Sequence, residues 1–145
     1  MMRNEQGFTL VEALIALIIV ATLSLISYPF IVNLNDYISL NRVITTFQAD
    51  LHYVRDFNMM PLHRDQQMIL RIHHHEDRYV ILIGADIQLE RALPRGITMP
   101  NERNISDISF NSQGNLGAGR TLQVVSQMNE RQVVFSVGVG GFDVR

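Results

Sequence analysis

The sequence contains neither cysteine nor lysine. Without cysteine the chain has no disulfide bond, thiolate metal site or cysteine nucleophile. All 12 basic residues are arginines, which excludes a Schiff-base lysine and the lysine of a phosphate-binding P-loop. The 14 acidic residues bring the formal net charge to −2, so the surface as a whole is not a cationic clamp for nucleic acid, although a local basic patch is compatible with it.

Apolar residues are unevenly distributed along the chain. Its 145 residues allow one modest domain, and the contents of 47% hydrophobic and 18% charged residues exclude intrinsic disorder. The mean hydropathy of +0.09 averages over two different parts. Residues 8–32 contain Glu12 as their only charge. Because roughly 20 helical residues cross the ~30 Å hydrocarbon core of a bilayer, this segment predicts a transmembrane helix.

Two simpler interpretations of this segment explain less. A cleaved secretory signal has an apolar stretch of about 7–15 residues, shorter than this one, although Ser24 and Ser27 have the spacing of a cleavage site. A plain membrane anchor leaves Glu12 unexplained, because an acidic side chain inside a bilayer costs about 2.5–3.5 kcal/mol. Glu12 is therefore expected to have a partner or a function.

The start of the chain resembles the class III signal of type IV pilins and pseudopilins. The resemblance rests on a short polar leader with Arg3, followed by Gly7-Phe8-Thr9-Leu10-Val11-Glu12-Ala13-Leu14. In that family a prepilin peptidase cuts after the glycine and methylates the new N-terminal phenylalanine. This implies cleavage between Gly7 and Phe8 and N-methylation of Phe8. It also implies an α+β fold, in which a long N-terminal helix with a transmembrane first half packs on a C-terminal antiparallel sheet.

The resemblance gives Glu12 a role in assembly rather than in catalysis. Cleavage would expose an amine at Phe8, and the carboxylate of Glu12 could pair with that amine on a neighbouring subunit. Arg3 in the leader favours a cytoplasmic N-terminus, which makes the protein a single-pass membrane protein with an extracytoplasmic C-terminal domain. In an assembled pilus the subunit would be displayed at the cell surface.

The sequence divides into four segments. Residues 1–7 are the leader, 8–32 the transmembrane and assembly helix, 33–60 its amphipathic continuation, and 61–145 a β-rich globular domain. Pro29 is expected to kink the helix or open it locally. An apolar stripe at helical spacing continues beyond it, and Pro61 ends the pattern. The stripe consists of Leu34, Ile38, Ile44, Phe47, Leu51 and Val54.

The period changes from helical to alternating after Pro61. Met68, Leu70 and Ile72 alternate with polar residues, and residues 79–83 form a second β-rich run, so the two predict a hairpin. Further strands are expected at 87–90, 105–110, 122–125 and 132–137. Because there is no disulfide, packing of the helical stripe on one antiparallel sheet must hold this domain together.

The C-terminal part resembles the H-type minor pseudopilin domain. The resemblance involves residues 108–121 and 131–135 and the glycine-rich end, and is nearest to the minor pseudopilin D of competence systems in monoderm bacteria. Relatives often carry a Gly-Arg pair before the final strand. Here Gly140-Gly141-Phe142 stands at that place, and the only nearby arginine is Arg145. The basic position to which relatives owe a DNA contact is therefore missing.

The resemblance implies a structural subunit without enzymatic activity or cofactor. Its function would be that of a minor pseudopilin of the competence pilus, supporting pilus initiation and DNA uptake in transformation. Implied partners are other minor pseudopilins, the major pseudopilin, prepilin peptidase, the assembly ATPase and the membrane platform protein. One alternative is a minor pseudopilin of a type II secretion system. Another is a DNA-binding tip receptor, with Arg120, Arg131 and Arg145 contacting phosphates.

Two further patterns favour structural interpretations. His73-His74-His75 contains metal-ligating side chains, but only the first and third share a face of a strand, so a solvated hairpin turn is expected instead of a metal site. The sequence lacks a Gly-x-Ser-x-Gly elbow, a His-Glu-x-x-His helix, a P-loop and a dinucleotide-binding glycine turn. No catalytic residues are predicted.

Overall fold

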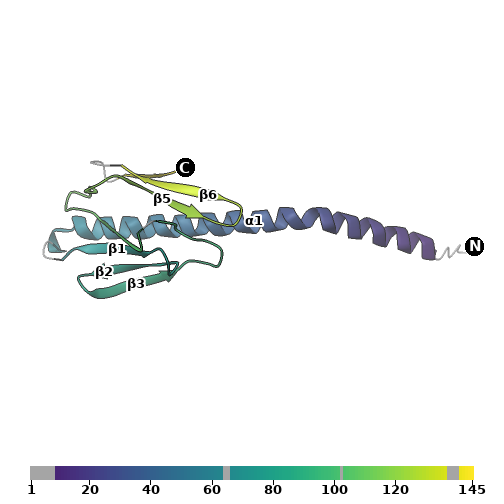
Figure 1. Ribbon diagram of the computed structural model, residues 1–145, viewed down its shortest axis with the longest axis horizontal. Helices are drawn as coiled ribbons and strands as arrows, with labels where there is room; N and C mark the ends of the chain where they lie inside the picture. The colour runs from purple at the N-terminus through teal and green to yellow at the C-terminus, as the bar shows by residue number, and fades with distance from the viewer. Residues whose placement is uncertain (1–8, 64–65, 102, 137–140) are drawn as a thin grey trace, which may run out of the picture. The chain divides into compact units, whose positions relative to one another are not determined.

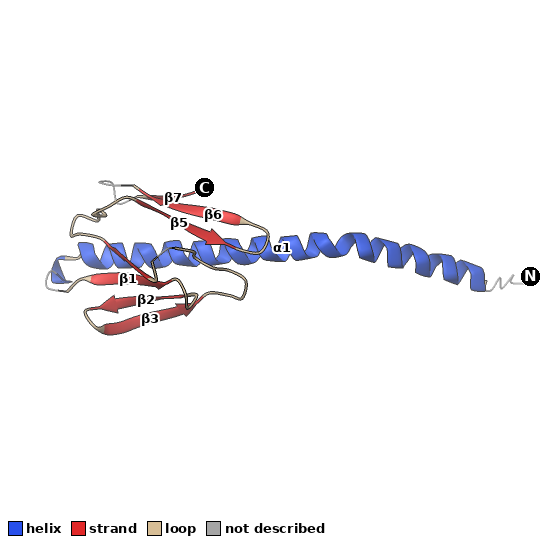
Figure 2. Cartoon of the chain, viewed as in Figure 1, coloured by secondary structure: helices blue, strands red, loops and turns tan. Residues whose placement is uncertain are grey.

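The computed structural model describes residues 9–63, 66–101, 103–136 and 141–145 (Figure 1). Helix α1 (Leu10–Met59) comes first, a 3-10 turn η1 (Pro61–His63) follows, and all later elements are strands (Figure 2). The chain divides into two compact units, residues 1–35 and residues 36–145. This is the expected α+β architecture of a long N-terminal apolar helix followed by antiparallel sheets.

The first unit consists of the N-terminal half of α1. Among the described residues, α1 is the one helix long and apolar enough to cross a membrane, and its most apolar window has a mean hydropathy of 2.5 and no buried residue. Thr22 and Ser24 donate their hydroxyls to carbonyl oxygens of the preceding turn at 2.8–3.0 Å. These bonds satisfy the Thr22 and Ser24 hydroxyls within the helix. The helix continues through Pro29 without a break, so the expected local opening is wrong.

The second unit forms its core around the C-terminal half of α1. Phe47, Leu51 and Val54 are fully buried, as the stripe predicted, and the Phe47 ring meets Tyr79 edge-on at 5.3 Å. Burial along α1 begins at Leu40, which the predicted stripe did not include. Leu34 and Ile38, expected to belong to the stripe, are each 46% exposed, so that part of the prediction is wrong.

In the part of the chain that the structure describes, seven strands form two antiparallel sheets, where the sequence predicted one. The first sheet has the order β3-β2-β1-β4 and the second the order β5-β6-β7. The expected hairpin is confirmed as β1 and β2, with Leu70 opposite Ile81. The strands are β1 (Met68–His73), β2 (Arg78–Ile83), β3 (Asp86–Ala92), β4 (Ile105–Ser109), β5 (Arg120–Val125), β6 (Glu130–Phe135) and β7 (Phe142–Val144).

One amide side chain ties the end of α1 to the first sheet. Asn58 accepts a hydrogen bond from the Met68 backbone N–H at 2.8 Å and donates to the carbonyl oxygens of Met68 and Phe110 at 2.9 and 3.1 Å. The Asn58 amide thereby supplies hydrogen-bond partners for backbone groups of Met68 and Phe110. The helix end is held in register with β1, which begins at Met68.

Candidate assembly and surface sites

Thr9 and Glu12 form a reciprocal cap at the start of α1. The Glu12 backbone N–H donates to the Thr9 hydroxyl at 3.3 Å, while Glu12 Oε2 accepts from the Thr9 backbone N–H at 2.9 Å and from its hydroxyl at 3.0 Å. This is the capping-box arrangement, in which an N-cap threonine and a glutamate three residues later satisfy each other's exposed groups. Glu12 therefore has a local structural partner as well as its expected role in assembly.

The cap uses only one oxygen of the Glu12 carboxylate. No described residue donates a hydrogen bond to Oε1, so this oxygen can accept a bond from another group without loss of the cap. Gly7 and Phe8, the predicted cleavage and methylation positions, lie outside the described residues. The sequence does carry the signal for the cap, a Thr-x-x-Glu pattern before an apolar run.

Asp36 ties the first turn of the second unit to the β5–β6 hairpin. Its Oδ2 accepts hydrogen bonds from the Ser126 hydroxyl at 2.6 Å, the Asn129 side-chain amide at 2.8 Å and the Met128 backbone N–H at 3.3 Å. The bonds from Ser126 and Asn129 contribute most to lowering the pKa of Asp36 below its ordinary value. The hairpin is thereby held against α1 where the unit begins.

A second aspartate holds α1 to the first sheet. Asp50 is buried and accepts a hydrogen bond from the Tyr79 hydroxyl at 2.7 Å. The Arg91 guanidinium donates to the same carboxylate from Nε at 2.6 Å and from Nη2 at 3.2 Å. Burial, together with the neighbouring carboxylate, raises the pKa of Tyr79 well above its ordinary value of 10.0. The network joins α1 to β2 and β3.

The three arginines predicted to contact DNA do not gather into one patch. Arg120 and Arg131 lie at opposite ends of the β5–β6 ladder, and the Arg131 guanidinium stands 5.9 Å from the centre of the Tyr37 ring. Arg145 follows β7, where its backbone pairs with that of Gln132 beside Arg131, and its guanidinium lies 3.6 Å from the Asp143 carboxylate. Phosphate binding depends on several cations close together, and Arg120, at the other end of the ladder, does not join the other two in one cluster.

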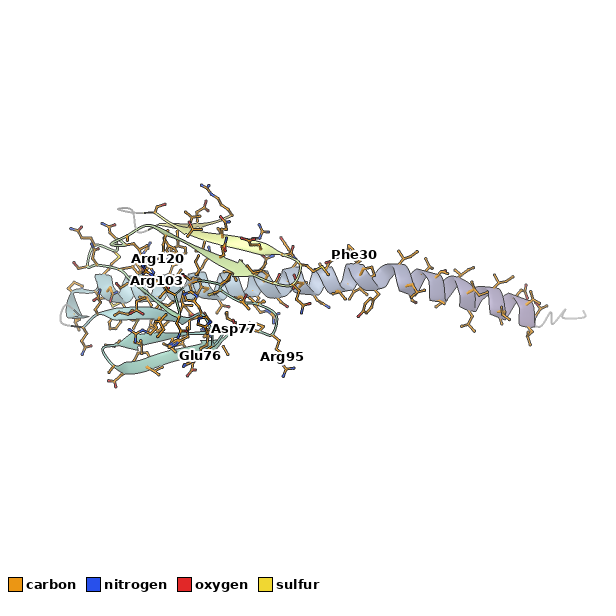
Figure 3. The ribbon with its side chains drawn as sticks, in the orientation of Figure 1. Phe30, Glu76, Asp77, Arg95, Arg103 and Arg120 are labelled. Carbon is orange, nitrogen blue, oxygen red and sulfur yellow. The ribbon has the colours of Figure 1, made fainter. Side chains whose placement is uncertain are left out.

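Arg120 instead shares a cavity with Arg103 (Figure 3). This cavity of about 330 Å³ is lined by residues of β4 and of the segment that leads into β5, with Ile72 and Leu122 among its apolar residues. The Arg120 side chain donates to the backbone carbonyl of Asp107 on β4 at 2.9 Å. Arg120 thus bridges the two sheets at their neighbouring edges.

The histidine turn differs from its expected solvated state at His73, whose side chain is only 17% exposed at the end of β1, and at His74. His74 is buried, with Nδ1 2.6 Å from the Met99 carbonyl oxygen and Nε2 2.9 Å from the Ser106 hydroxyl. Since a carbonyl oxygen only accepts, Nδ1 donates to Met99, and Nε2 shares a hydrogen bond with the Ser106 hydroxyl. His75 is exposed as predicted. No metal-binding group of three histidine, cysteine or carboxylate residues occurs in the part of the chain that the structure describes.

Comparison with known proteins gives one match, at the N-terminus. No curated protein and no solved structure matches the chain. Residues 2–28 match the family model of the prokaryotic N-terminal methylation motif. The match covers the leader, the Thr9–Glu12 cap and most of the exposed apolar helix. It supports a type IV pilin-like or pseudopilin subunit, and it is consistent with processing by prepilin peptidase and with membrane anchoring.

Proposed function

We propose that this protein is a minor pseudopilin of the competence pilus, which supports pilus initiation and DNA uptake. The observation that carries the proposal is the methylation motif at residues 2–28, on a helix whose most apolar window contains no buried residue. Such a helix needs a lipid environment before assembly and neighbouring helices after it. The globular unit would lie outside the cytoplasm, joined to sibling minor pseudopilins and the major pseudopilin.

The processing step is tested by replacing Gly7. Prepilin peptidase should cut the native chain between Gly7 and Phe8 and leave an N-methylated phenylalanine, whereas Gly7→Leu should remain at its full precursor mass. Intact-mass spectrometry of the membrane fraction measures both species. Asn4→Leu is the matched control within the leader and should be processed normally. A normal mature mass for Gly7→Leu would exclude this cleavage site.

The role of Glu12 is tested by separating its charge from its cap. Glu12→Gln keeps a residue that can complete the capping box but removes the negative charge, whereas Thr9→Val removes the cap and keeps the charge. If Glu12 pairs with the Phe8 amine of a neighbour, Glu12→Gln should lower incorporation into fibres at least tenfold and Thr9→Val much less, an effect of about 1.4 kcal/mol or more. Quantitative immunoblotting of sheared fibres measures the difference. The opposite order would assign Glu12 to capping alone.

The choice of machine is tested in the producing cell. Deletion of the gene should abolish transformation by added DNA and leave the set of secreted proteins unchanged. Loss of secreted proteins with normal transformation would instead support the alternative, a minor pseudopilin of a type II secretion system. Under the proposal, the neighbouring genes should encode the assembly ATPase and the platform protein of the competence pilus.

The tip-receptor alternative makes a separate prediction. If the protein were a DNA-binding tip receptor, the full chain in detergent would shift the mobility of labelled DNA at low salt. The triple variant Arg120→Gln, Arg131→Gln, Arg145→Gln would then lose this shift. Arg120 lies at the other end of the β5–β6 ladder from Arg131 and Arg145, so the three arginines do not form one cluster and we expect no shift for the native chain. A salt-dependent shift that the triple variant abolishes would support the receptor.

A further inference from the structure

Strands β4 and β5 each lie at the edge of a sheet, and a tight turn between them begins a hairpin. Each strand has a neighbour of its own sheet on one side only. Phe110, just after β4, forms an antiparallel bridge with Leu116, and the Asn111 N–H donates to the Asn115 carbonyl oxygen at 2.9 Å. Beyond this bridge, the described residues show no further pairing between the two strands. The hairpin therefore opens after its first bridge.

The opening contains the cavity of about 330 Å³ that Arg103 and Arg120 share. Ile108 of β4 and Leu122 of β5 line it from the two strands, together with Ile72 of β1. All three of these apolar side chains are buried. Ligand sites typically measure roughly 300–1,000 Å³ and combine apolar walls with a few polar groups. The cavity has the size and the composition of a small site of this kind.

On one side of the opening, β5 presents backbone groups that have no partner. Val125 exchanges two hydrogen bonds with Thr98 along this edge, at 2.9 and 2.8 Å. Residues two apart in a strand direct their N–H and C=O to the same side, so Gln123 and Thr121 also face this edge. The same register would place Pro100 opposite Gln123, but proline has no N–H to donate. Among the described residues, Thr121 and Gln123 have no backbone partner on this side.

On the other side of the opening, a side chain binds the edge of β4. The Asn104 carbonyl oxygen accepts from the His74 N–H at 2.9 Å, which directs it toward β1. The Asp107 carbonyl, three residues later, points to the opposite side, where it accepts from Arg120 at 2.9 Å. Charged side chains commonly cover the edge of a sheet in this way. The Arg120 guanidinium thereby occupies an acceptor that a further strand would use.

Arg103 and Arg120 bring two guanidinium groups to the cavity (Figure 3), and no described acidic side chain lines it. The Asp107 carboxylate binds Arg71 through both of its oxygens at 2.7 Å. In the part of the chain that the structure describes, neither Arg103 nor Arg120 forms an ion pair. Glu102, next to Arg103 in the sequence, lies outside the described residues. An acidic side chain in the cavity would complement the two arginines.

We propose that the opening between β4 and β5 binds a short extended segment of another protein chain, which joins the two sheets by β-strand addition. The backbone of this segment would pair with Thr121 and Gln123 on one side. On the other side, one of its N–H groups would replace Arg120 at the Asp107 carbonyl and release the guanidinium for an acidic side chain. Because alternate residues of a strand share a face, this acidic residue lies two positions from an apolar residue that packs against the cavity wall.

The free backbone groups favour a peptide over a small anion. A phosphate or carboxylate only accepts hydrogen bonds, so it leaves the carbonyl oxygens of Thr121 and Gln123 without donors. An extended backbone offers donors and acceptors in alternation, as the edge of a strand requires. The inference goes beyond the proposed function, because it depends only on contacts within residues 36–145. It applies equally to a subunit of a competence pilus and to one of a secretion system.

The test uses a peptide of sequence Thr-Val-Thr-Glu-Thr with a trifluoroacetyl cap and an amidated end. Its valine and glutamate share one face of a strand, as the cavity requires. Added to the full chain in detergent micelles, the peptide should show saturable broadening of its fluorine NMR signal, and empty micelles should cause none. N-methylation of its central threonine removes one strand N–H and should weaken binding about tenfold. Inorganic phosphate should not displace the peptide; displacement would indicate an anion site and overturn the proposal.

Matched variants of the chain show where the peptide binds. Gln123→Pro removes the N–H that faces the opening and should weaken binding about tenfold, whereas Gln123→Ala keeps this N–H and should bind normally.

The arginine contact is tested with a second peptide, in which glutamine replaces glutamate. Arg103→Gln should weaken binding of the glutamate peptide about threefold and leave that of the glutamine peptide unchanged. Arg95→Gln and Glu102→Gln are the controls and should weaken neither. Urea unfolding checks that each variant remains folded, and the comparison of methylated and unmethylated peptides on the native chain needs no variant. Equal binding by Gln123→Pro and Gln123→Ala, or no saturation below about 1 mM peptide, would overturn the proposal.

Discussion

Replacement of Asp50 by alanine removes the acceptor on which Tyr79 and Arg91 both depend. The Asp50 side chain is only 9% exposed, and Tyr79 is 2% exposed. Arg91 has 42% of its side chain in solvent, so water can replace its lost partner. The Tyr79 hydroxyl has no such access. The two donors should therefore contribute very differently to the loss of stability.

The magnitude follows from these exposures. A buried hydroxyl left without a partner costs about 1–3 kcal/mol, and loss of a hydrogen bond to a charged group costs about 1.5–3 kcal/mol. The Asp50→Ala variant should accordingly lose about 3 kcal/mol of unfolding free energy. That is a large share of the roughly 5–15 kcal/mol available to a small domain. Tyr79→Phe leaves the Asp50–Arg91 pair in place and should lose only about 1 kcal/mol.

The decisive measurement is a double variant. Asp50→Ala with Tyr79→Phe has no orphaned hydroxyl, so it should be about 1–2 kcal/mol more stable than Asp50→Ala alone. Urea unfolding of the full chain in mild detergent, followed by tyrosine near-ultraviolet circular dichroism and by far-ultraviolet circular dichroism, gives the three free energies. If the double variant were less stable than Asp50→Ala, burial of an unsatisfied hydroxyl could not be the cause.

Three further predictions concern other polar contacts of the globular unit. The raised pKa of Tyr79 keeps it protonated when folded, so unfolding free energy should fall by about 1.4 kcal/mol per pH unit above pH 10, in alkaline urea titrations, and less so in Tyr79→Phe. Because the pKa of Asp36 is lowered in the folded state, its stabilising contribution to the unfolding free energy should be present above pH 3.8 and be lost as the pH falls further. Asp36→Ala should speed amide hydrogen exchange at Met128 by about tenfold. Asn58→Ala should cost about 2–3 kcal/mol in urea unfolding, because it orphans the buried Met68 N–H; a loss below 0.5 kcal/mol would contradict this role.

The elements predicted correctly are those that local patterns specify. The apolar run, its single acid and the helical stripe through Phe47 and Val54 all follow from side-chain spacing within a few turns. The β1–β2 hairpin is equally local, because its strands are separated by one short turn. The end of α1 at Met59 precedes Pro61, which cannot donate a helical hydrogen bond.

The features that the sequence did not predict involve contacts between segments that are distant in the sequence. Strand β7 has three residues after a glycine-rich stretch, too short for an alternating pattern to be recognised. The division into two sheets depends on which strand edges meet, and strand alternation carries no information about that. His74 is buried because Met99 and Ser106, far along the chain, supply partners for both ring nitrogens.

For the functional residues the same division holds. The sequence by itself determined the methylation motif, the membrane-length helix and the position of Glu12, because these are properties of a continuous segment. Only the tertiary structure placed Arg120 away from Arg131 and Arg145 and buried Asp50 against Tyr79. The sequence shows which residues are charged or polar. Which partner each of them binds depends on the packing of strands and loops that are distant in the sequence.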